Sequence, residues 1–230
     1  SSWPLLIKLN HHHSEHLEDT ATILKLVEVT QFKCQFMVGK STDHMPNIAH
    51  KYDGDLNSLK EQLLDVSQNG YQHWWDFNGE IRAFLNGSRH YDSRSRYLLW
   101  KYENHLRSQS AGSAPMSYTE FINEAPGASL DQSIEHFMPQ NPEGITHSEE
   151  FIDQHLNNLG NLVLMTRGRN SSLKNSLPLT KSKNLKNSLQ LVSQLRIVNE
   201  CLEAGEWGAN QIESRKAKIV DFARNYWHIR

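Results

Sequence analysis

Apolar residues recur at helical spacing through the first half of the chain. Between Leu17 and Phe36 the apolar positions include Ile23, Leu24, Leu26 and Val27, the interval expected for one helix face. Asp55 can cap a second helix, which is predicted to run through Val66 with a stripe of Leu56, Leu59, Leu63 and Leu64. Residues 79–85 and 95–106 predict two more helices, so we expect residues 1–110 to form a helical module.

The pattern changes near residue 110. Residues 108–118 are small and polar, which favours a break between domains, and we place a linker at 111–130. Beyond it, short apolar runs around Ile134 and from Leu162 to Met165 predict strands. Helices are predicted at 151–159, at 184–203 and from about 209 to 227. We therefore expect residues 131–230 to form a second domain.

Composition narrows the class of protein. The chain has 230 residues, 37% of them hydrophobic, and it lacks both a signal-peptide pattern and the roughly 18 consecutive apolar residues of a membrane span. Its two cysteines, Cys34 and Cys201, suit a reducing compartment. The prediction is a soluble cytoplasmic protein with no membrane association. Because the first residue is not Met, we expect this chain to be a fragment of a longer protein.

Candidate chemistry gathers around the two predicted strands. Glu135 and His136 lie together on the first, and Asn161 opens the second. A neutral His with a pKa near neutrality suits a general base that activates water. Carboxylate and amide oxygens are the hard ligands that Mg²⁺ prefers. Adjacent strand residues point to opposite faces, so a bend near Pro139 is expected, with His136 at an exposed loop edge.

This arrangement resembles the HNH (His-Me finger) nucleases, and more closely the C-terminal domain of GmrSD-type restriction endonucleases. The residues that carry the resemblance are Ser133–Gln140, Leu159–Met165, Asn170 and Asn175. The resemblance implies a ββα-metal finger over about 131–178, in a mainly α protein of the α+β type. It also implies cleavage of DNA phosphodiesters with one Mg²⁺ or Mn²⁺ ion per site.

Site roles follow from the resemblance. His136 is the implied general base, and Asn161 is the implied residue that orients the loop carrying it. In the family, this Asn lies nine residues before the last metal ligand, and here 170 − 161 = 9. Glu135 and Asn170 are therefore the implied metal ligands. Asn175 is an alternative to Asn170, although a structural role is the first interpretation.

The resemblance continues outside the finger. Similar segments are Arg96–Glu103, Leu173–Pro178 and a Trp-x₄-Ile-x₂-Arg pattern at Trp207, Ile212 and Arg215, followed by Trp227. Phe137 departs from the family, which usually has Ile at this position. The resemblance implies an effector domain in defence against phage DNA, serving a nucleotide-handling sensor domain that precedes this chain. Related systems respond to phosphorothioate or to glucosylated DNA, and this chain does not choose between them.

A basic run follows the second predicted strand. It contains no acidic residue and consists of Arg167, Arg169, Lys174, Lys181, Lys183 and Lys186. We expect these cations to contact DNA phosphates, with a solvated helical face as the alternative. The chain's formal net charge of −2 argues for weak DNA binding. A second functional hypothesis is a catalytically silent DNA- or protein-binding module that regulates an N-terminal nucleotidase.

Overall fold

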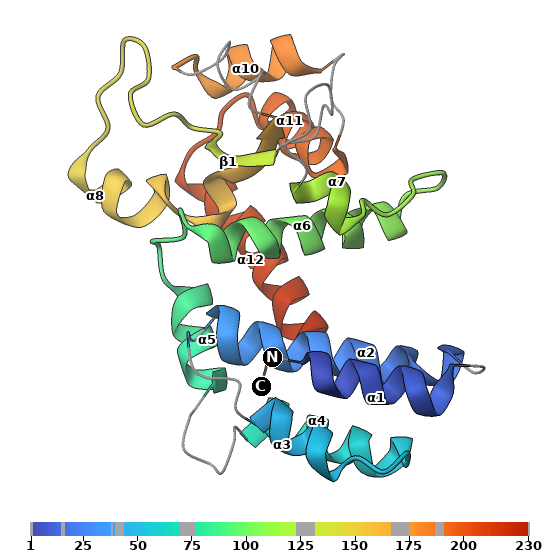
Figure 1. Ribbon diagram of the computed structural model, residues 1–230. Helices are drawn as coiled ribbons and strands as arrows, with labels where there is room; N and C mark the ends of the chain where they lie inside the picture. Colours follow the sequence, from blue (N-terminus) through green and yellow to red (C-terminus); the bar gives the residue numbers. More distant parts are fainter. Residues whose placement is uncertain are drawn as a thin grey trace. The chain divides into compact units, whose positions relative to one another are not determined.

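The computed structural model describes residues 2–14, 17–37, 39, 44–69, 77–122, 132–166, 175–186 and 191–229 (Figure 1). Contacts divide the chain into two compact units. Unit 1 contains residues 1–85 and 224–230, and unit 2 contains residues 86–223. Among the described residues, no helix combines the length and the apolar character that crossing a membrane requires.

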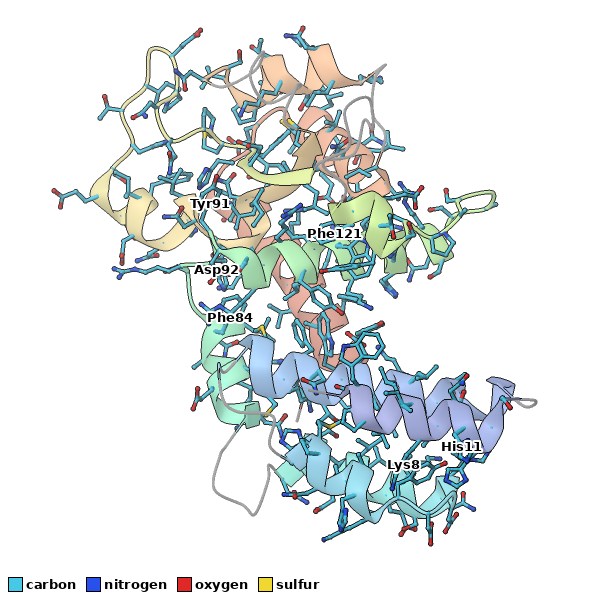
Figure 2. The ribbon with its side chains drawn as sticks, viewed as in Figure 1. Lys8, His11, Phe84, Tyr91, Asp92 and Phe121 are labelled. Carbon is cyan, nitrogen blue, oxygen red and sulfur yellow. The ribbon has the colours of Figure 1, made fainter. Side chains whose placement is uncertain are left out.

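The regular secondary structure described in unit 1 is helical. Its elements are α1 (Trp3–His13), α2 (Leu17–Gln31), the π-helix η1 (Phe32–Met37), α3 (His44–Lys51), α4 (Leu56–Asn69) and α5 (Phe77–Asn86). Asp55 precedes α4, and its carboxylate accepts the backbone N–H of Asn57 at 2.9 Å, so the predicted cap is confirmed. Lys8 of α1, labelled in Figure 2, donates to the carbonyl of Tyr52 at 3.0 Å.

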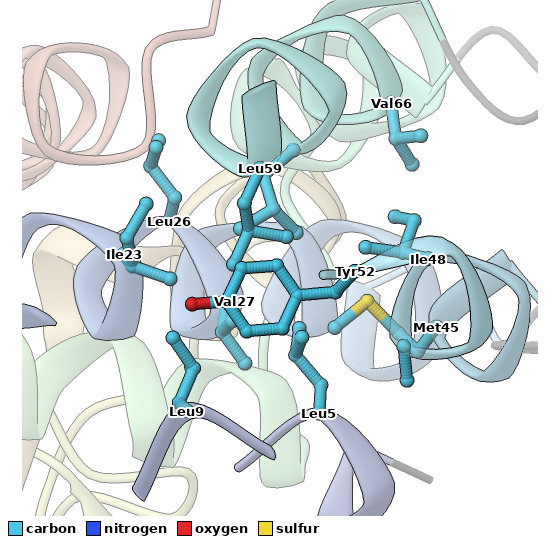
Figure 3. Packing of buried hydrophobic residues seen from close by; sticks show 12 residues of the cluster. Leu5, Leu9, Ile23, Leu26, Val27, Met45, Ile48, Tyr52, Leu59 and Val66 are labelled. Atoms are coloured by element: carbon cyan, nitrogen blue, oxygen red, sulfur yellow. The ribbon is translucent and has the colours of Figure 1, made fainter. Parts of the chain in front are cut away.

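The core of unit 1 is built from the predicted helical stripes. Leu5, Leu9, Ile23, Val27 and Leu59 meet there (Figure 3). Leu5 and Leu9 are four residues apart, and so are Ile23 and Val27. This spacing places both side chains of a pair on the same face of their helix. Leu24 is the exception in the α2 pattern, since it is 45% exposed and lies off the core-facing stripe.

The end of the chain is anchored in unit 1 by polar and aromatic contacts. Lys33 is fully buried, and its Nζ donates to the carbonyls of Ser67 and His228 and to Oδ1 of Asn78, at 2.9, 3.1 and 3.2 Å. Trp227 stacks on Phe32 with ring centroids 3.9 Å apart. These contacts give the terminal Trp of the sequence pattern a structural role.

Unit 2 surrounds a pair of antiparallel strands with helices (Figure 1). Its elements are α6 (Ser93–Ser108), α7 (Tyr118–Ile122), β1 (Gln132–His136), α8 (Glu149–Phe151), the π-helix η3 (Ile152–Leu156), the 3₁₀ turn η4 (Leu159–Asn161), β2 (Leu162–Thr166), α10 (Pro178–Leu185), α11 (Val192–Ala204) and α12 (Ala209–Tyr226). The predicted mainly α fold is confirmed over the described residues. The predicted 184–203 helix corresponds to two helices, α10 and α11.

Strand β2 is apolar at every position from Leu162 to Met165 because both of its faces are covered. It contacts α6 and α11. Val163 and Met165 belong to a cluster that includes Phe137 and Trp207, whose rings meet edge to face at 5.2 Å. The larger ring of Phe137 is thus accommodated by an aromatic partner.

Helix α6 belongs to unit 2, together with the two strands. The sequence pattern instead predicts that α6 is part of a separate helical module at residues 1–110. The carboxylate of Glu103, fully buried, accepts the backbone N–H groups of Val192 and Ser193 at 2.9 and 2.8 Å. Part of the predicted linker is also bound to α6, because the carbonyl of Met116 accepts hydrogen bonds from Trp100 and Asn104. Residues 123–130 of that linker lie outside the described residues.

The Leu159–Leu162 turn is pressed against α12. A methyl group added to Gly160 would collide with the backbone carbonyl of Ile212. Arg215, one helical turn further on, donates through Nη1 to the carbonyls of Leu159, Gly160 and Leu162 at 3.1, 2.8 and 2.7 Å. Burial lowers the pKa of Arg215 to about 10, so the guanidinium remains charged at neutral pH. These contacts explain the Ile-x₂-Arg pattern physically.

We expect Gly160→Ala to destabilise unit 2 by at least about 1–3 kcal/mol, because the added methyl must displace backbone of α12 rather than a flexible side chain. Gly208→Ala is the matched control, since its methyl would meet only Oε1 of Gln211 at 3.7 Å. Guanidinium denaturation followed by circular dichroism measures both. Equal midpoints for the two variants would contradict the close approach at Gly160.

Candidate functional site

His136 is the last residue of β1 and pairs with Leu162, the first residue of β2. Immediately beyond the pairing, the backbone N–H of Phe137 donates to the carbonyl of Asn161 at 2.8 Å. The chain therefore leaves the strand directly after His136. Asn161 lies opposite the departure point, in the turn that opens β2.

The side chain of Asn161 clamps the loop that leaves β1. Its Oδ1 accepts the backbone N–H of Met138 at 2.8 Å, while its Nδ2 donates to the carbonyls of Met138 and Leu156 at 3.0 and 2.9 Å. Asn161 is fully buried, so these hydrogen bonds satisfy both polar atoms of a side chain that is shielded from water. Asn161 is therefore bonded to the loop that follows His136, while its role in orienting His136 for catalysis stays a prediction.

The imidazole of His136 is held along one edge and on one face. Nε2 lies 2.9 Å from Oδ1 of Asn157, and the ring of Tyr91 stacks on it with centroids 4.6 Å apart and planes 20° apart. Because an amide oxygen only accepts, Nε2 carries the proton and Nδ1 carries the lone pair. The side chain is 8% exposed, so the expected exposed loop edge was wrong: Tyr91 and Asn157 cover the ring.

Burial also favours the neutral form of His136. It lowers the pKa of the imidazole; the hydrogen bond to Asn157 opposes this shift, and the positive charge of Lys181 adds to it. The ring is consequently neutral at neutral pH. This is the protonation state in which a histidine accepts a proton from water.

Glu135 shares this neighbourhood. Burial raises the pKa of the Tyr91 hydroxyl, and the Glu135 carboxylate raises it further. Burial lowers the pKa of Lys181 to about 8, and the same carboxylate opposes that shift. Both of these partners contact His136 or its backbone, so the negative charge of Glu135 acts within the surroundings of the imidazole.

Lys181 differs from Lys183 and Lys186, the other described cations of the basic run. It is 5% exposed, on the inner face of α10 with Pro178 and Leu185, and its Nζ donates to the carbonyl of His136 at 2.9 Å. Its ammonium is therefore buried, which does not suit the predicted contact with DNA phosphates. Lys183 and Lys186 are exposed. Arg167, Arg169, Asn170 and Lys174 lie outside the described residues.

Asn175, the alternative to Asn170, is exposed. Its backbone carbonyl accepts the N–H of Glu143 at 3.2 Å, which connects it to the long loop after β1. Among the described residues, no group of three or more His, Cys, Asp or Glu side chains is arranged to hold a metal ion.

A cleft of about 650 Å³ opens beside Tyr91 and Asn157, the two residues that contact the imidazole of His136. Its lining consists of Arg89, Tyr91, Asp92, Gln140, Glu149, Ile152, Asp153 and Asn157. Tyr91 and Asp92 are labelled in Figure 2, at the start of α6. Sequence reasoning missed Tyr91 and Asn157. Neither stands in a motif or on a periodic face, and Tyr91 is 43 residues from Ile134, the strand residue to which it bonds.

We expect Asn161→Asp to lower the free energy of unfolding by about 2–4 kcal/mol, because two donated hydrogen bonds become contacts between a buried carboxylate and carbonyl oxygens. Asn184→Asp introduces the same charge at an exposed position of α10 and should change stability by less than about 0.5 kcal/mol. Denaturant midpoints give the comparison. If the two variants lose equal stability, the hydrogen bonds of Asn161 contribute little to the free energy of unfolding.

One known protein family matches most of unit 2. The family model for GmrSD restriction endonucleases, C-terminal domain, matches residues 75–222, which is more than half of the chain and nearly all of unit 2. No curated protein and no solved structure matches the chain. The matched span includes the strand pair, the clamp at Asn161, Arg215 and the segment that carries Tyr91. The chain therefore belongs to the C-terminal domain family of the GmrSD restriction endonucleases, a nuclease family.

Proposed function

We propose that unit 2 is an HNH, or ββα-metal, nuclease that hydrolyses DNA phosphodiesters with His136 as the general base. The observation that carries the proposal is the state of the imidazole. It stands at the end of β1 with Nε2 bonded to Asn157, a lone pair on Nδ1 and a pKa lowered by burial. Membership of a restriction endonuclease family supplies the substrate class.

In this mechanism, Nδ1 of His136 takes a proton from the water that attacks the phosphorus in line. The bond from phosphorus to the 3′ oxygen breaks, that oxygen takes a proton from solvent, and the products carry 5′-phosphate and 3′-hydroxyl ends. Asn157 supports the step because its Oδ1 keeps accepting the hydrogen bond from Nε2–H while the ring becomes positively charged. Asn161 keeps the loop beyond His136 in place through both polar atoms of Met138.

One divalent ion, Mg²⁺ or Mn²⁺, would be held by Glu135 and Asn170. When bound, the ion supplies Lewis-acid stabilisation of the charge that develops on the leaving oxygen. The donor set fits such an ion, because a carboxylate and an amide oxygen are hard ligands and Mg²⁺ keeps several waters. Glu135 is partly exposed at the penultimate position of β1, so an ion bound to its carboxylate could keep water ligands.

DNA backbone contact is proposed for Lys183 and Lys186, which are exposed on α10 and directly after it. The same contact is proposed from the sequence alone for Arg167, Arg169 and Lys174, which lie outside the described residues. Lys181 has a structural role instead, because its ammonium donates a hydrogen bond to the carbonyl of His136 and so connects the end of β1 to α10. We further propose that the nuclease serves modification-dependent defence, with sensing in a separate N-terminal domain.

His136→Ala and His136→Gln should each lower the rate of plasmid nicking in Mg²⁺ by about 10²–10⁴-fold, the usual contribution of a general base. Supercoiled plasmid separates this reaction from mere DNA binding. His50→Ala, which removes an exposed histidine of unit 1, is the control and should keep the parent rate. Circular dichroism verifies folding. A folded, fully active His136→Gln protein would refute the assignment of the base.

Glu135→Ala and Asn170→Ala should each raise the Mn²⁺ concentration for half-maximal nicking by about ten-fold or more, since loss of even indirect metal partners costs 10- to 100-fold. Asn175→Ala is the matched control. A Mn²⁺ titration of nicking rate measures all three. A raised requirement for Asn175→Ala alone would show that the nine-residue register is wrong.

Lys183→Ala combined with Lys186→Ala should flatten the dependence of DNA affinity on salt, by about 0.9 in log–log slope for each phosphate that the protein no longer neutralises. The exposed pair Lys51 and Lys60 of unit 1, replaced together by Ala, removes the same charge elsewhere. Fluorescence anisotropy on two unrelated duplexes gives the slopes. An unchanged slope would mean a solvated face, and weakening of one duplex alone would mean that these lysines read bases.

A further inference from the structure

We propose that Tyr91 is a positioning residue that holds the imidazole of His136 in its working orientation. The segment Arg89–Asp92, upstream of the strand pair, thereby becomes part of the catalytic centre. This inference rests on the proposed function of His136, and it adds a residue that the finger itself does not contain.

Tyr91 touches the strand end at two points. Its ring stacks on the ring of His136, with centroids 4.6 Å apart, and its hydroxyl donates to the carbonyl of Ile134 at 3.1 Å. The aromatic ring is thus fixed to β1 while it covers one face of the imidazole.

Tyr91 and Asn157 restrain different motions of the same side chain. The hydrogen bond from Nε2 to Asn157 fixes an edge of the imidazole, whereas a stacked ring resists tilting of its plane. With the edge and the face both held, the direction of the Nδ1 lone pair is fixed. That direction decides whether a water in line with the phosphorus can be deprotonated.

His90 connects Tyr91, its neighbour in the chain, to the segment that carries Asn157. The side chain of His90 is fully buried. Its backbone N–H donates to the carbonyl of Asn157 at 2.8 Å, and its Nδ1 accepts the N–H of Leu159 at 3.2 Å. Asp92, on the other side of Tyr91, caps α6 by accepting the N–H groups of Arg94 and Ser95. Tyr91 is therefore held between two anchored residues.

Core packing does not explain Tyr91, because the residue is 51% exposed. Removing its ring empties little buried space, so the fold should survive the loss. Tyr118 offers a matched comparison in the same unit. It is 53% exposed, and its ring also leans on aromatic neighbours, Trp100 and Phe121, rather than on His136.

The test compares Tyr91→Ala, Tyr91→Phe and Tyr118→Ala in plasmid nicking by the full chain. We expect Tyr91→Ala to lower kcat by about ten-fold or more with KM unchanged, a part of the 10²–10⁴-fold contribution of a general base. Tyr91→Phe should restore most of the rate, because it keeps the stacked ring. Tyr118→Ala should retain the parent kcat. A rise in KM alone for Tyr91→Ala would overturn the proposal and make Tyr91 a DNA contact.

A second readout needs neither DNA nor metal. Long-range ¹⁵N–¹H spectra of ¹⁵N-histidine protein report the imidazole tautomer, with the His136 signals identified by their loss in His136→Ala. The parent and Tyr91→Phe should show the Nε2–H tautomer, and Tyr91→Ala should show a mixture. An unchanged tautomer together with an unchanged kcat would overturn the positioning role. An active His136→Ala would instead remove the proposed function, while the spectra still judge the ring contact.

Discussion

The structure of the site depends on satisfying the backbone polar groups of one buried turn, Leu159–Leu162. From this turn, the side chain of Asn161 forms hydrogen bonds with the backbone of Met138 and Leu156. Buried N–H and C=O groups need partners, and Arg215 donates to three carbonyls of the turn itself. Gly160 lets α12 approach closely enough for Arg215 to reach them. The position of His136 follows, because the loop beyond it is bonded to this turn.

The imidazole of His136, the proposed general base, depends on supports outside its own strand. β1 has five residues and a single described partner strand, so backbone pairing alone fixes the imidazole weakly. The supports come instead from outside the pair: Asn157 ends the helical insertion, and Tyr91 precedes α6. Both are tied to His90 or to its neighbours, which couples the upstream helix to the chemistry of the strand end.

How far the sequence predicts this arrangement depends on how local each feature is. The helical stripes of unit 1 and the cap at Asp55 follow from spacing and from side chains near their own backbone. They were predicted correctly except for Leu24, which is exposed. The unit to which α6 belongs was not predicted correctly, because Glu103 bonds residues about 90 positions away and such a bond has no sequence period. Tyr91 escaped prediction for the same reason, and Asn170 and the arginines of the basic run lie outside the described residues.

The burial of Lys181 shows why a run of charges is a poor guide to a binding surface. Lys181 and Leu185 are four residues apart and share the inner face of α10, whereas Lys183 and Lys186 face solvent. Helical periodicity thus divides one basic run into a buried cation that bonds the carbonyl of His136 and exposed cations available to phosphates. A buried ammonium needs acceptors and a nearby negative charge, and the carbonyl of His136 and the carboxylate of Glu135 supply them. The same residues that are proposed to carry the chemistry therefore also stabilise helix α10.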